Sequence, residues 1–253
     1  MISVITPTCD RQRYLQGLYR TYTAQTYQHR ELLVYDDSSV PSAFMCRLDD
    51  PTVRYFHRPP GLTIGEKRNW LIGQANGDTI AHFDDDDYYS PDYLSIMDAL
   101  LDEHDFVKLI GWFLVDIVSG GLFYWDTATI LDRHFVVGDG LPPRVVELSP
   151  IEDKDAWIRH QTYGYGFSYV YRRHLASRIL FAHMNKGEDY MFATACEEAG
   201  FRLHFAADRA GIVAHILHGA NSSRAFPNYR LRWDLFPSLS AVLTERQDVF
   251  RDR

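Results

Sequence analysis

The sequence has few cysteines and no long apolar run. Its three cysteines, Cys9, Cys46 and Cys196, are scattered and odd in number, which fits neither a disulfide framework nor a metal-ligand spacing. No apolar segment approaches the roughly 20 residues that a membrane-spanning helix needs. The chain opens directly on a β-prone segment, residues 2–6, so we expect no signal peptide. These absences favour a protein of the reducing cytoplasm.

Positive charge is also in short supply. The 253 residues include 26 lysines and arginines against 34 aspartates and glutamates, and the net charge of −8 argues against a nucleic-acid partner. A chain of this length can bury one sizeable core. Because no repeat, low-complexity tract or linker divides it, we expect one domain over residues 1–225 and a helical tail over residues 226–253.

Two common nucleotide-binding signatures are missing. No G-x-G-x-x-G follows the first predicted strand, which argues against a dinucleotide-binding Rossmann site. The segment from Gly61 to Lys67 has glycines and a lysine, but their spacing is wrong for a P-loop. The chain is therefore neither a P-loop enzyme nor an ordinary dehydrogenase.

What the chain does contain is a run of four consecutive carboxylates at residues 84–87, called the acidic run below. Adjacent carboxylates repel one another, and an oxygen-seeking divalent cation such as Mg²⁺ or Mn²⁺ would offset that repulsion. The alternative is a solvated loop whose charge is favoured by the dipole of a following helix. An EF-hand fits poorly, because Tyr89 and Ser95 stand where its glycine and glutamate belong.

Short β-prone runs alternate with helical patterns around the acidic run. We predict strands at residues 2–6, 31–35, 53–56 and 79–83, with Pro7 ending the first, and helices at residues 14–22, at residues 65–75 and after a Ser90-Pro91-Asp92 start. This order predicts an α/β fold with a mainly parallel sheet. Ligands bind outside the carboxyl ends of such strands, and polar residues follow three of them, at residues 7–10, 36–37 and 84–87.

The second half of the sequence is harder to interpret. Residues 106–118 and 121–125 predict a hairpin around Ser119-Gly120-Gly121, and residues 167–171 are β-like. Residues 132–157 look irregular, whereas the tail from Tyr229 onward has a helical pattern. His215 and His218 precede a loop rich in Gly and Asn, although a lone histidine is more often structural.

Four segments together resemble glycosyltransferase family 2. They are SVITPTCDR (3–11), ELLVYDDSS (31–39), GEKRNWLIGQANGDTIAHFDDDDYYSPDYL (65–94) and GEDYMF (187–192), in the order that the family has them. The resemblance implies a GT-A fold, with a Rossmann-like, mainly parallel central sheet flanked by helices and a small antiparallel region on the acceptor side. Residues 1–100 would bind the nucleotide sugar and residues 101–225 the acceptor.

The resemblance also implies roles for individual residues. In the family, a nucleoside-diphosphate sugar lies at the carboxyl edge of the sheet, here with UDP favoured as its nucleotide. The donor contacts would come from Pro7, Thr8, Asp10, Arg11, Asp37, Lys67, Arg68, Asp84 and Asp85. A Mn²⁺ or Mg²⁺ cofactor would be held by Asp86 of the D-x-D pair and by His218. One departure is Cys9-Asp10, where the family often has an aromatic residue and asparagine.

The catalytic pair implied by the resemblance is Glu188-Asp189, with Asp189 as the base and Glu188 as its alternative. A pair of acids at a helix N-terminus without catalytic role is the plain interpretation. The predicted acceptor, a saccharide or glycoconjugate, would stack on Trp157, Tyr163 and Tyr165, although such rings more often fill the core. The tail would close over the donor, pair with another subunit or touch the inner face of the membrane.

The sequence therefore predicts a metal-dependent, inverting glycosyltransferase. Inversion comes from the resemblance and not from any spacing in this chain. Three alternatives stay open: a non-catalytic nucleotide- or carbohydrate-binding protein with a degenerate transferase fold, a sugar nucleotidylyltransferase, and a phosphohydrolase. The second would need a glycine-rich basic loop after the first strand, which residues 6–11 do not provide.

Overall fold

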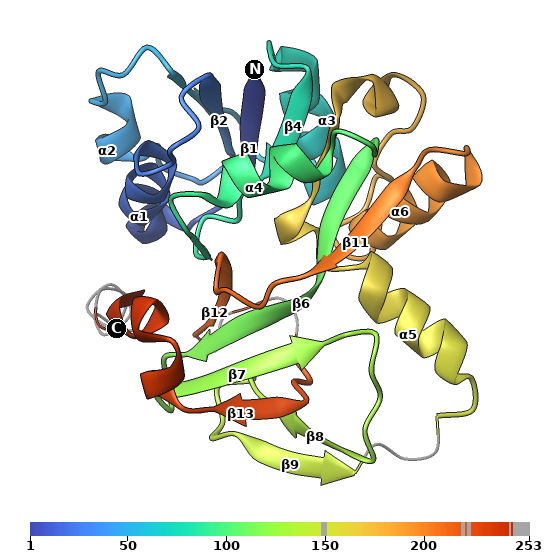
Figure 1. Ribbon diagram of the computed structural model, residues 1–253. Coiled ribbons are helices and arrows are strands. Elements are labelled where there is room, and N and C mark those ends of the chain that lie inside the picture. Colours follow the sequence, from blue (N-terminus) through green and yellow to red (C-terminus); the bar gives the residue numbers. More distant parts are fainter. Residues whose placement is uncertain (148–150, 219–220, 222–223, 243, 245–253) are drawn as a thin grey trace. The chain divides into compact units, whose positions relative to one another are not determined.

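The computed structural model describes residues 1–147, 151–218, 221, 224–242 and 244 (Figure 1). The chain forms two compact units. The first comprises Met1–Asp86, Pro91–Lys108 and Tyr163–Phe205, and the second comprises Asp87–Ser90, Leu109–Thr162 and Ala206–Arg253. Within the described part of the chain, no helix is both long enough and apolar enough to cross a bilayer.

The first unit is built on a mainly parallel sheet, as the sequence predicts. Its parallel strands stand in the order β4-β1-β2-β3, and β10 continues the sheet antiparallel to β4 and to the start of β6. These strands are β1 (Ile2–Thr8), β2 (Arg30–Asp36), β3 (Val53–His57), β4 (Thr79–His82), β6 (Phe106–Asp116) and β10 (Val170–Arg172). The helices of this unit are α1 (Gln12–Thr23), α2 (Ala43–Cys46), α3 (Ile64–Gln74), α4 (Tyr93–Leu100) and α6 (Glu188–Glu198).

The sequence of the two central strands explains their burial. β1 and β2 read as nearly continuous apolar runs, which is typical of parallel strands covered on both faces. Thr63 caps the start of helix α3: its hydroxyl accepts a hydrogen bond from the backbone of Glu66, while the Glu66 carboxylate accepts one from the backbone of Thr63. This capping box fixes the start of the helix that carries Lys67 and Arg68.

Two predicted boundaries in the first unit are wrong. Pro7 does not end β1, which continues to Thr8. Because β4 pairs with β1 only as far as Ile5, the missing N–H of Pro7 costs no ladder bond on that side. The Ser90-Pro91-Asp92 start also fails, since α4 begins at Tyr93 and the carboxylate of Asp92 accepts a hydrogen bond from Thr26 instead of capping the helix.

The second unit is built mainly from antiparallel pairs. The predicted hairpin is confirmed, because β6 pairs with β7 (Gly121–Asp126). β13 (Tyr229–Leu231) pairs with β7, and β12 (Val213–Leu217) runs parallel to β6 and antiparallel to β5 (Tyr88–Tyr89). The unit also holds the hairpin of β8 (Arg133–Val136) and β9 (Arg144–Glu147) and a 3-10 turn at Trp233–Leu235. Two elements are shared between the units: helix α5 (Lys154–Tyr163), whose last residue belongs to the first unit, and β11 (Leu203–Ala207), most of which does.

Three expectations for the second half of the sequence are corrected. The described part of residues 132–157 is not irregular throughout, since it holds β8, β9 and the start of α5. The β-like segment at residues 167–171 begins as a 3-10 turn, Gly166–Ser168, and only then enters β10. The expected helical tail begins instead as strand β13, because residues 229–233 alternate apolar and basic side chains, a period-two pattern. Helical structure is found further along the tail, at the described residues 237–242 and 244. Much of the predicted tail, residues 243 and 245–253, lies outside the described residues.

A buried carboxylate ties the strands of the first unit together. Glu31 on β2 accepts hydrogen bonds from the hydroxyl of Ser3 on β1 (2.6 Å) and from the backbone N–H of Asn76 ahead of β4 (2.6 Å). Its other oxygen accepts one from Arg54 on β3 (3.4 Å). Burial alone would raise the pKa of Glu31, but these hydrogen bonds outweigh it and hold the pKa below its ordinary value of 4.5.

We expect Glu31→Ala to lower the free energy of unfolding at pH 7 by about 3 kcal/mol, because the buried donors of Ser3 and Asn76 lose their acceptor. The contribution should be complete above pH 4.5 and lost as the pH falls through the lower pKa of the folded state. Urea denaturation at several pH values measures both effects. Glu147→Ala is the control, since Glu147 pairs with Arg133 at the surface and should matter by less than about 1 kcal/mol. Equal losses of unfolding free energy in the two variants would contradict the role of Glu31 in holding the strands together.

Candidate active site

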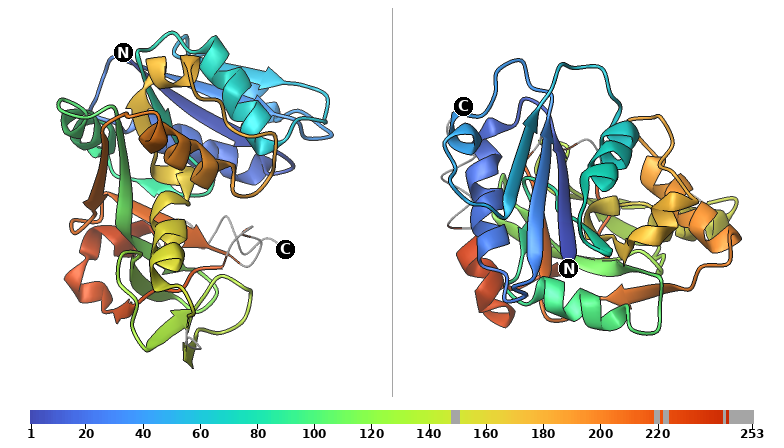
Figure 2. Two further views of the ribbon diagram at one scale, coloured as in Figure 1. Left: turned by 90° about the vertical axis from the view of Figure 1, so that its right-hand side faces the viewer. Right: turned by 90° about the horizontal axis from the view of Figure 1, so that it is seen from above.

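The carboxyl ends of the parallel strands bring the predicted donor residues to one edge of the first unit. β1 and β2 lie side by side in register up to Thr8 and Asp36 (Figure 2). The hydroxyl of Thr8 donates a hydrogen bond of 2.6 Å to Asp85, which follows β4. The expected convergence of polar residues at this edge is therefore observed.

The acidic run is buried rather than solvated. Asp85 and Asp86 are each 4% exposed and Asp87 is 1% exposed, so the solvated-loop interpretation is wrong. In the first unit, the guanidinium of Arg11 lies 3.0 Å from Asp85 and also binds Asp86. In the second unit, Asp87 lies 2.9 Å from His215 Nδ1 and accepts a backbone hydrogen bond from Ile216. Protein groups thus compensate much of the charge of the run.

The donor set of the acidic run fits a hard divalent cation. One carboxylate oxygen from each of Asp84, Asp86 and Asp87 lies within 4.8 Å of the other two. An all-oxygen set of this kind suits Mg²⁺ or Mn²⁺. Among the described residues, this group contains no histidine. His218 belongs to the second unit, is 3% exposed, and donates its backbone N–H to Asn221.

Asp37 and Lys67, which were predicted separately as donor contacts, form a buried ion pair. Lys67 Nζ lies 2.5 Å from Asp37 Oδ1, and both side chains are 6% exposed. Asp10 stands nearby in the left-handed backbone region (φ 52°), where its N–H donates to the hydroxyl of Ser38. The loops after β1 and β2 are therefore held together by direct hydrogen bonds.

A second buried ion pair separates the roles of the two predicted catalytic acids. Arg68 Nη1 lies 2.6 Å from Glu188 Oε1, and both side chains are buried. Burial raises the pKa of Glu188, although the charge of Arg68 opposes this shift. Because its carboxylate is engaged with Arg68, Glu188 is poorly placed to accept a proton from an acceptor.

Asp189 is half-buried in the first turn of α6, which follows Gly187 in the left-handed region (φ 85°). Its carboxylate accepts hydrogen bonds from the backbone N–H groups of Gly166 (2.9 Å) and Tyr190 (2.7 Å). A Cβ on Gly166 would lie 3.0 Å from the Cβ of Asp189, so the turn packs closely on the acid. Two fixed donors orient a carboxylate that is still reachable from solvent.

The three predicted acceptor residues fall in different surroundings. Tyr165 lies in the turn that holds Asp189, in the left-handed region (φ 61°), and burial together with the charge of Asp189 raises its pKa. Tyr163 is part of the hydrophobic core of the first unit, and its hydroxyl binds Glu197. Trp157 is half-buried in the second unit, with its ring edge-on to His134.

Sequence reasoning missed two buried polar side chains next to this turn, His82 and Lys108. His82 Nδ1 donates to the carbonyl of Gly166 (3.0 Å), and the hydroxyl of Tyr171 donates to His82 Nε2 (3.1 Å). Burial lowers the pKa of His82 well below its ordinary value, which keeps the ring neutral. The available signal was an ionisable residue inside a run that otherwise reads as a buried strand, as in TIAHF and FVKLIGWF.

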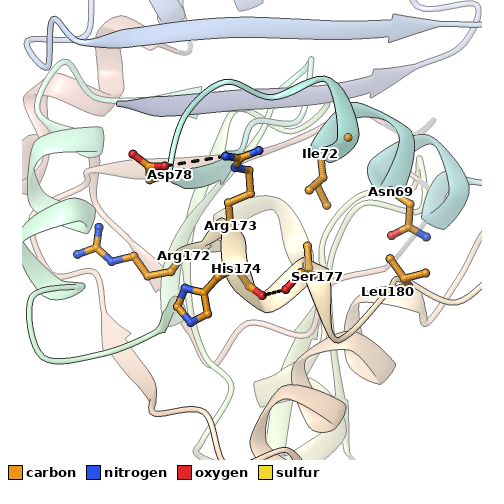
Figure 3. A pocket seen from close by; sticks show the side chains of 10 residues that line it. Asn69, Ile72, Asp78, Arg172, Arg173, His174, Ser177 and Leu180 are labelled. Carbon is orange, nitrogen blue, oxygen red and sulfur yellow. Dashed lines mark hydrogen bonds and ion pairs between the residues drawn. The ribbon is translucent and has the colours of Figure 1, made fainter.

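A cavity of about 600 Å³ in the first unit contains none of the predicted site residues (Figure 3). It is lined by Asn69, Ile72, Gly73, Asp78, Arg172, Arg173, His174, Ala176, Ser177 and Leu180. Arg173 points toward Asp78, at 3.9 Å, whereas the guanidinium of Arg172 is bonded to Thr79 and to the carbonyl of Leu101. Its charged groups do not converge on one point, so we do not assign the donor to it.

Residues 3–180 match the family described as Glycosyl transferase family 2. Among curated proteins, the chain is 28% identical over 134 residues to WcaA of Escherichia coli K12, a glycosyl transferase named for colanic acid biosynthesis, covering 51% of this chain and 47% of WcaA. It is 28% identical over 131 residues to the glycosyltransferase GlyG of Streptococcus pneumoniae serotype 4, covering 49% and 43%. The chain thus spans about half the length of the curated relatives it matches.

Two solved structures resemble most of the chain. Residues 1–349 of S. aureus TarS in complex with UDP-GlcNAc have a TM-score of 0.60 at 18% identity, over 96% of this chain and 66% of that one. The mannosyltransferase PcManGT of Pyrobaculum calidifontis, in complex with GDP-Man and Mn²⁺, has a TM-score of 0.59 at 13% identity, over 87% and 58%. These likenesses confirm the predicted GT-A fold.

We expect the Arg68–Glu188 pair to behave as a coupled buried ion pair. Arg68→Met and Glu188→Leu should each lower the free energy of unfolding by about 3–5 kcal/mol, since each leaves one buried charge uncompensated. The double variant should recover much of that loss, because neither charge is then present. Urea denaturation of the four proteins gives the coupling free energy.

The exposed pair of Arg232 and Asp234 supplies the matched control. In the cycle of Arg232→Met and Asp234→Asn, the coupling should stay below about 1 kcal/mol. A buried pair whose coupling is no larger than that of the exposed pair would contradict the description of this site.

Proposed function

The chain belongs to glycosyl transferase family 2 and is a transferase enzyme, and from that premise we propose how its site works. We propose that it moves a sugar from a nucleoside-diphosphate sugar to a hydroxyl of a saccharide or glycoconjugate, with inversion at the anomeric carbon. One observation carries the proposal: the first unit holds both an acidic strand edge, at Asp85 and Asp86, and a reachable carboxylate at Asp189 oriented by two backbone N–H groups.

The donor is proposed to lie at the carboxyl edge of the sheet in the first unit. The mixed charge of this edge, with Arg11 and Lys67 among the aspartates, supports a ligand that carries both phosphates and sugar hydroxyls. TarS and PcManGT are described in complex with UDP-GlcNAc and GDP-Man, which supports a nucleotide sugar as donor class. We favour a UDP-sugar, with Asp37 toward the base or ribose and Asp84 toward the ribose.

A divalent cation, Mn²⁺ or Mg²⁺, is proposed as the cofactor. Asp86 would hold it, with Asp84 and Asp87 as neighbouring oxygen ligands, and His218 is the further ligand that the family resemblance suggests. When bound, such a cation acts as a Lewis acid that stabilises the negative charge developing on the leaving diphosphate. Arg11 lies against Asp85 and Asp86, so its guanidinium would reach the same phosphates only by giving up part of these ion pairs.

Asp189 is proposed as the general base. As the sugar passes through an oxocarbenium-like state, the acceptor hydroxyl attacks and its proton moves to the carboxylate of Asp189. Backbone N–H groups of Gly166 and Tyr190 hold that carboxylate in place throughout. A base that acts late, once bond formation has acidified the hydroxyl, needs no strong pKa shift. Tyr165, in the same turn, is the best placed of the three proposed acceptor contacts.

The alternatives are weaker for physical reasons. A degenerate, non-catalytic fold has no need of a half-buried acid oriented by two N–H groups. A nucleotidylyltransferase would use a glycine-rich basic loop after β1, where this chain has Pro7, Thr8 and Cys9. The cysteines are free thiols, which supports our placing the enzyme in the cytoplasm. Contact with the inner face of the membrane is a further expectation.

We expect Asp189→Asn to abolish transfer and to leave donor binding intact. The amide cannot take the proton, so kcat should fall by a factor of about 100 to 10,000. Release of nucleoside diphosphate in the presence of a saccharide acceptor panel measures transfer, and calorimetry with Mn²⁺ measures donor affinity, which should change by less than about twofold.

Glu198→Gln, at the exposed end of the same helix, is the control and should keep full activity. A fully active Asp189→Asn variant would refute the base assignment. Donor binding without turnover in the unmodified protein would favour the non-catalytic alternative.

A further inference from the structure

Lys108 is a fully buried lysine on β6 in the first unit. It is 0% exposed and lies in the apolar strand FVKLIGWF. Its ammonium nitrogen donates a hydrogen bond to the carbonyl of Gly164 and lies 5.6 Å from the centre of the Tyr169 ring. An apolar side chain would avoid the desolvation cost of this amine, and the hydrogen bond to Gly164 helps to offset that cost.

The carbonyl that Lys108 holds belongs to the turn that orients Asp189. Gly164 begins this turn, Tyr165 occupies the left-handed region within it, and Gly166 ends it by donating its N–H to the Asp189 carboxylate. Tyr169 reinforces the connection, because its hydroxyl contacts the carbonyls of both Tyr163 and Asp189. A chain of direct contacts therefore runs from Lys108 through the turn to the carboxylate.

The electrostatics agree with this geometry. Burial lowers the pKa of Lys108 to about 7, and the negative charge of Asp189 opposes that shift. The side chain can donate to the Gly164 carbonyl in its charged or its neutral form, so the contact does not depend on its titration.

We propose that Lys108 is a positioning residue for Asp189, which holds the turn at residues 164–166 so that the N–H of Gly166 fixes the catalytic carboxylate. This inference rests on the proposed function, since it takes Asp189 as the base. The contacts of Lys108 described above are to Gly164 and Tyr169, which lie outside the strand-end loops proposed to bind the donor. Its loss should therefore change the chemical step and leave donor binding unchanged.

The test compares two Lys108 variants with the unmodified protein. Lys108→Met removes the N–H group that binds the Gly164 carbonyl. It should lower kcat by about 100-fold, because a misplaced base is costly, while the KM for the sugar donor changes by less than about twofold. Lys108→Gln keeps an N–H donor on a side chain one bond shorter. Its kcat should lie between those of the unmodified protein and of Lys108→Met. It also leaves a polar partner for Gly164, so it carries the same test if Lys108→Met does not fold.

Val107→Ala is the matched control. Val107 is also fully buried and directly precedes Lys108 on β6, so its side chain points to the opposite face of the sheet. It should lower the unfolding temperature yet keep kcat within about twofold. Equal losses of kcat in Val107→Ala and Lys108→Met would reduce Lys108 to a structural role and overturn the proposal.

Amide hydrogen exchange gives a readout that does not require turnover. In Lys108→Met or Lys108→Gln, peptides covering residues 163–168 should lose protection, whereas the end of α6 should keep it. Unchanged protection in that turn would overturn the positioning role even if kcat fell. Failure of the proposed function looks different, because the unmodified protein would then turn over no donor at all.

Discussion

Repulsion among the four carboxylates of the acidic run is the constraint on which the site most depends. Three of the four are buried, where like charges are most costly, so each needs a partner. Arg11 and Thr8 serve Asp85 and Asp86 in the first unit, and His215 serves Asp87 in the second. One oxygen from each of Asp84, Asp86 and Asp87 lies close enough to the other two for a single divalent cation. A bound cation would neutralise the negative charge of the run that these protein groups leave uncompensated.

The pairing of buried charges also explains the rest of the site. Two buried ion pairs, Lys67 with Asp37 and Arg68 with Glu188, join helix α3 to the loop after β2 and to the start of α6. Buried pairs of this kind add little net stability, but they fix the positions of the elements that they join. Since Arg68 engages Glu188, its neighbour Asp189 is left with only backbone donors from Gly166 and Tyr190 among its hydrogen bonds described above. Adjacent acids thus take different roles through their partners.

Much of the first unit could be predicted from the sequence because its strands and helices follow simple periods. Apolar runs marked β1, β2 and β4, and polar residues after them marked the binding edge. Local rules failed where tertiary contacts decided the outcome. The hydroxyl of Thr26 donates to the carboxylate of Asp92, which would otherwise have been free to cap α4. Residues 229–231 form a strand because they pair with β7. Arg68 could be located but not its partner, because Glu188 stands 120 residues away. Lys108 went unnoticed, although a lysine in a buried strand was visible in the sequence.

We propose above all that the acidic edge binds a nucleoside diphosphate together with a metal. The most direct measurement is the thermal unfolding midpoint with a panel of nucleoside diphosphates, with and without Mn²⁺. A ligand at ~100 times its dissociation constant adds ~2.7 kcal/mol, which should raise the midpoint by roughly 5–10 °C. Our account predicts such a shift for one nucleotide, dependent on Mn²⁺, lost in Asp86→Ala and kept in the exposed-site control Asp102→Ala. No shift with any nucleotide, or an equal shift in Asp86→Ala, would contradict it.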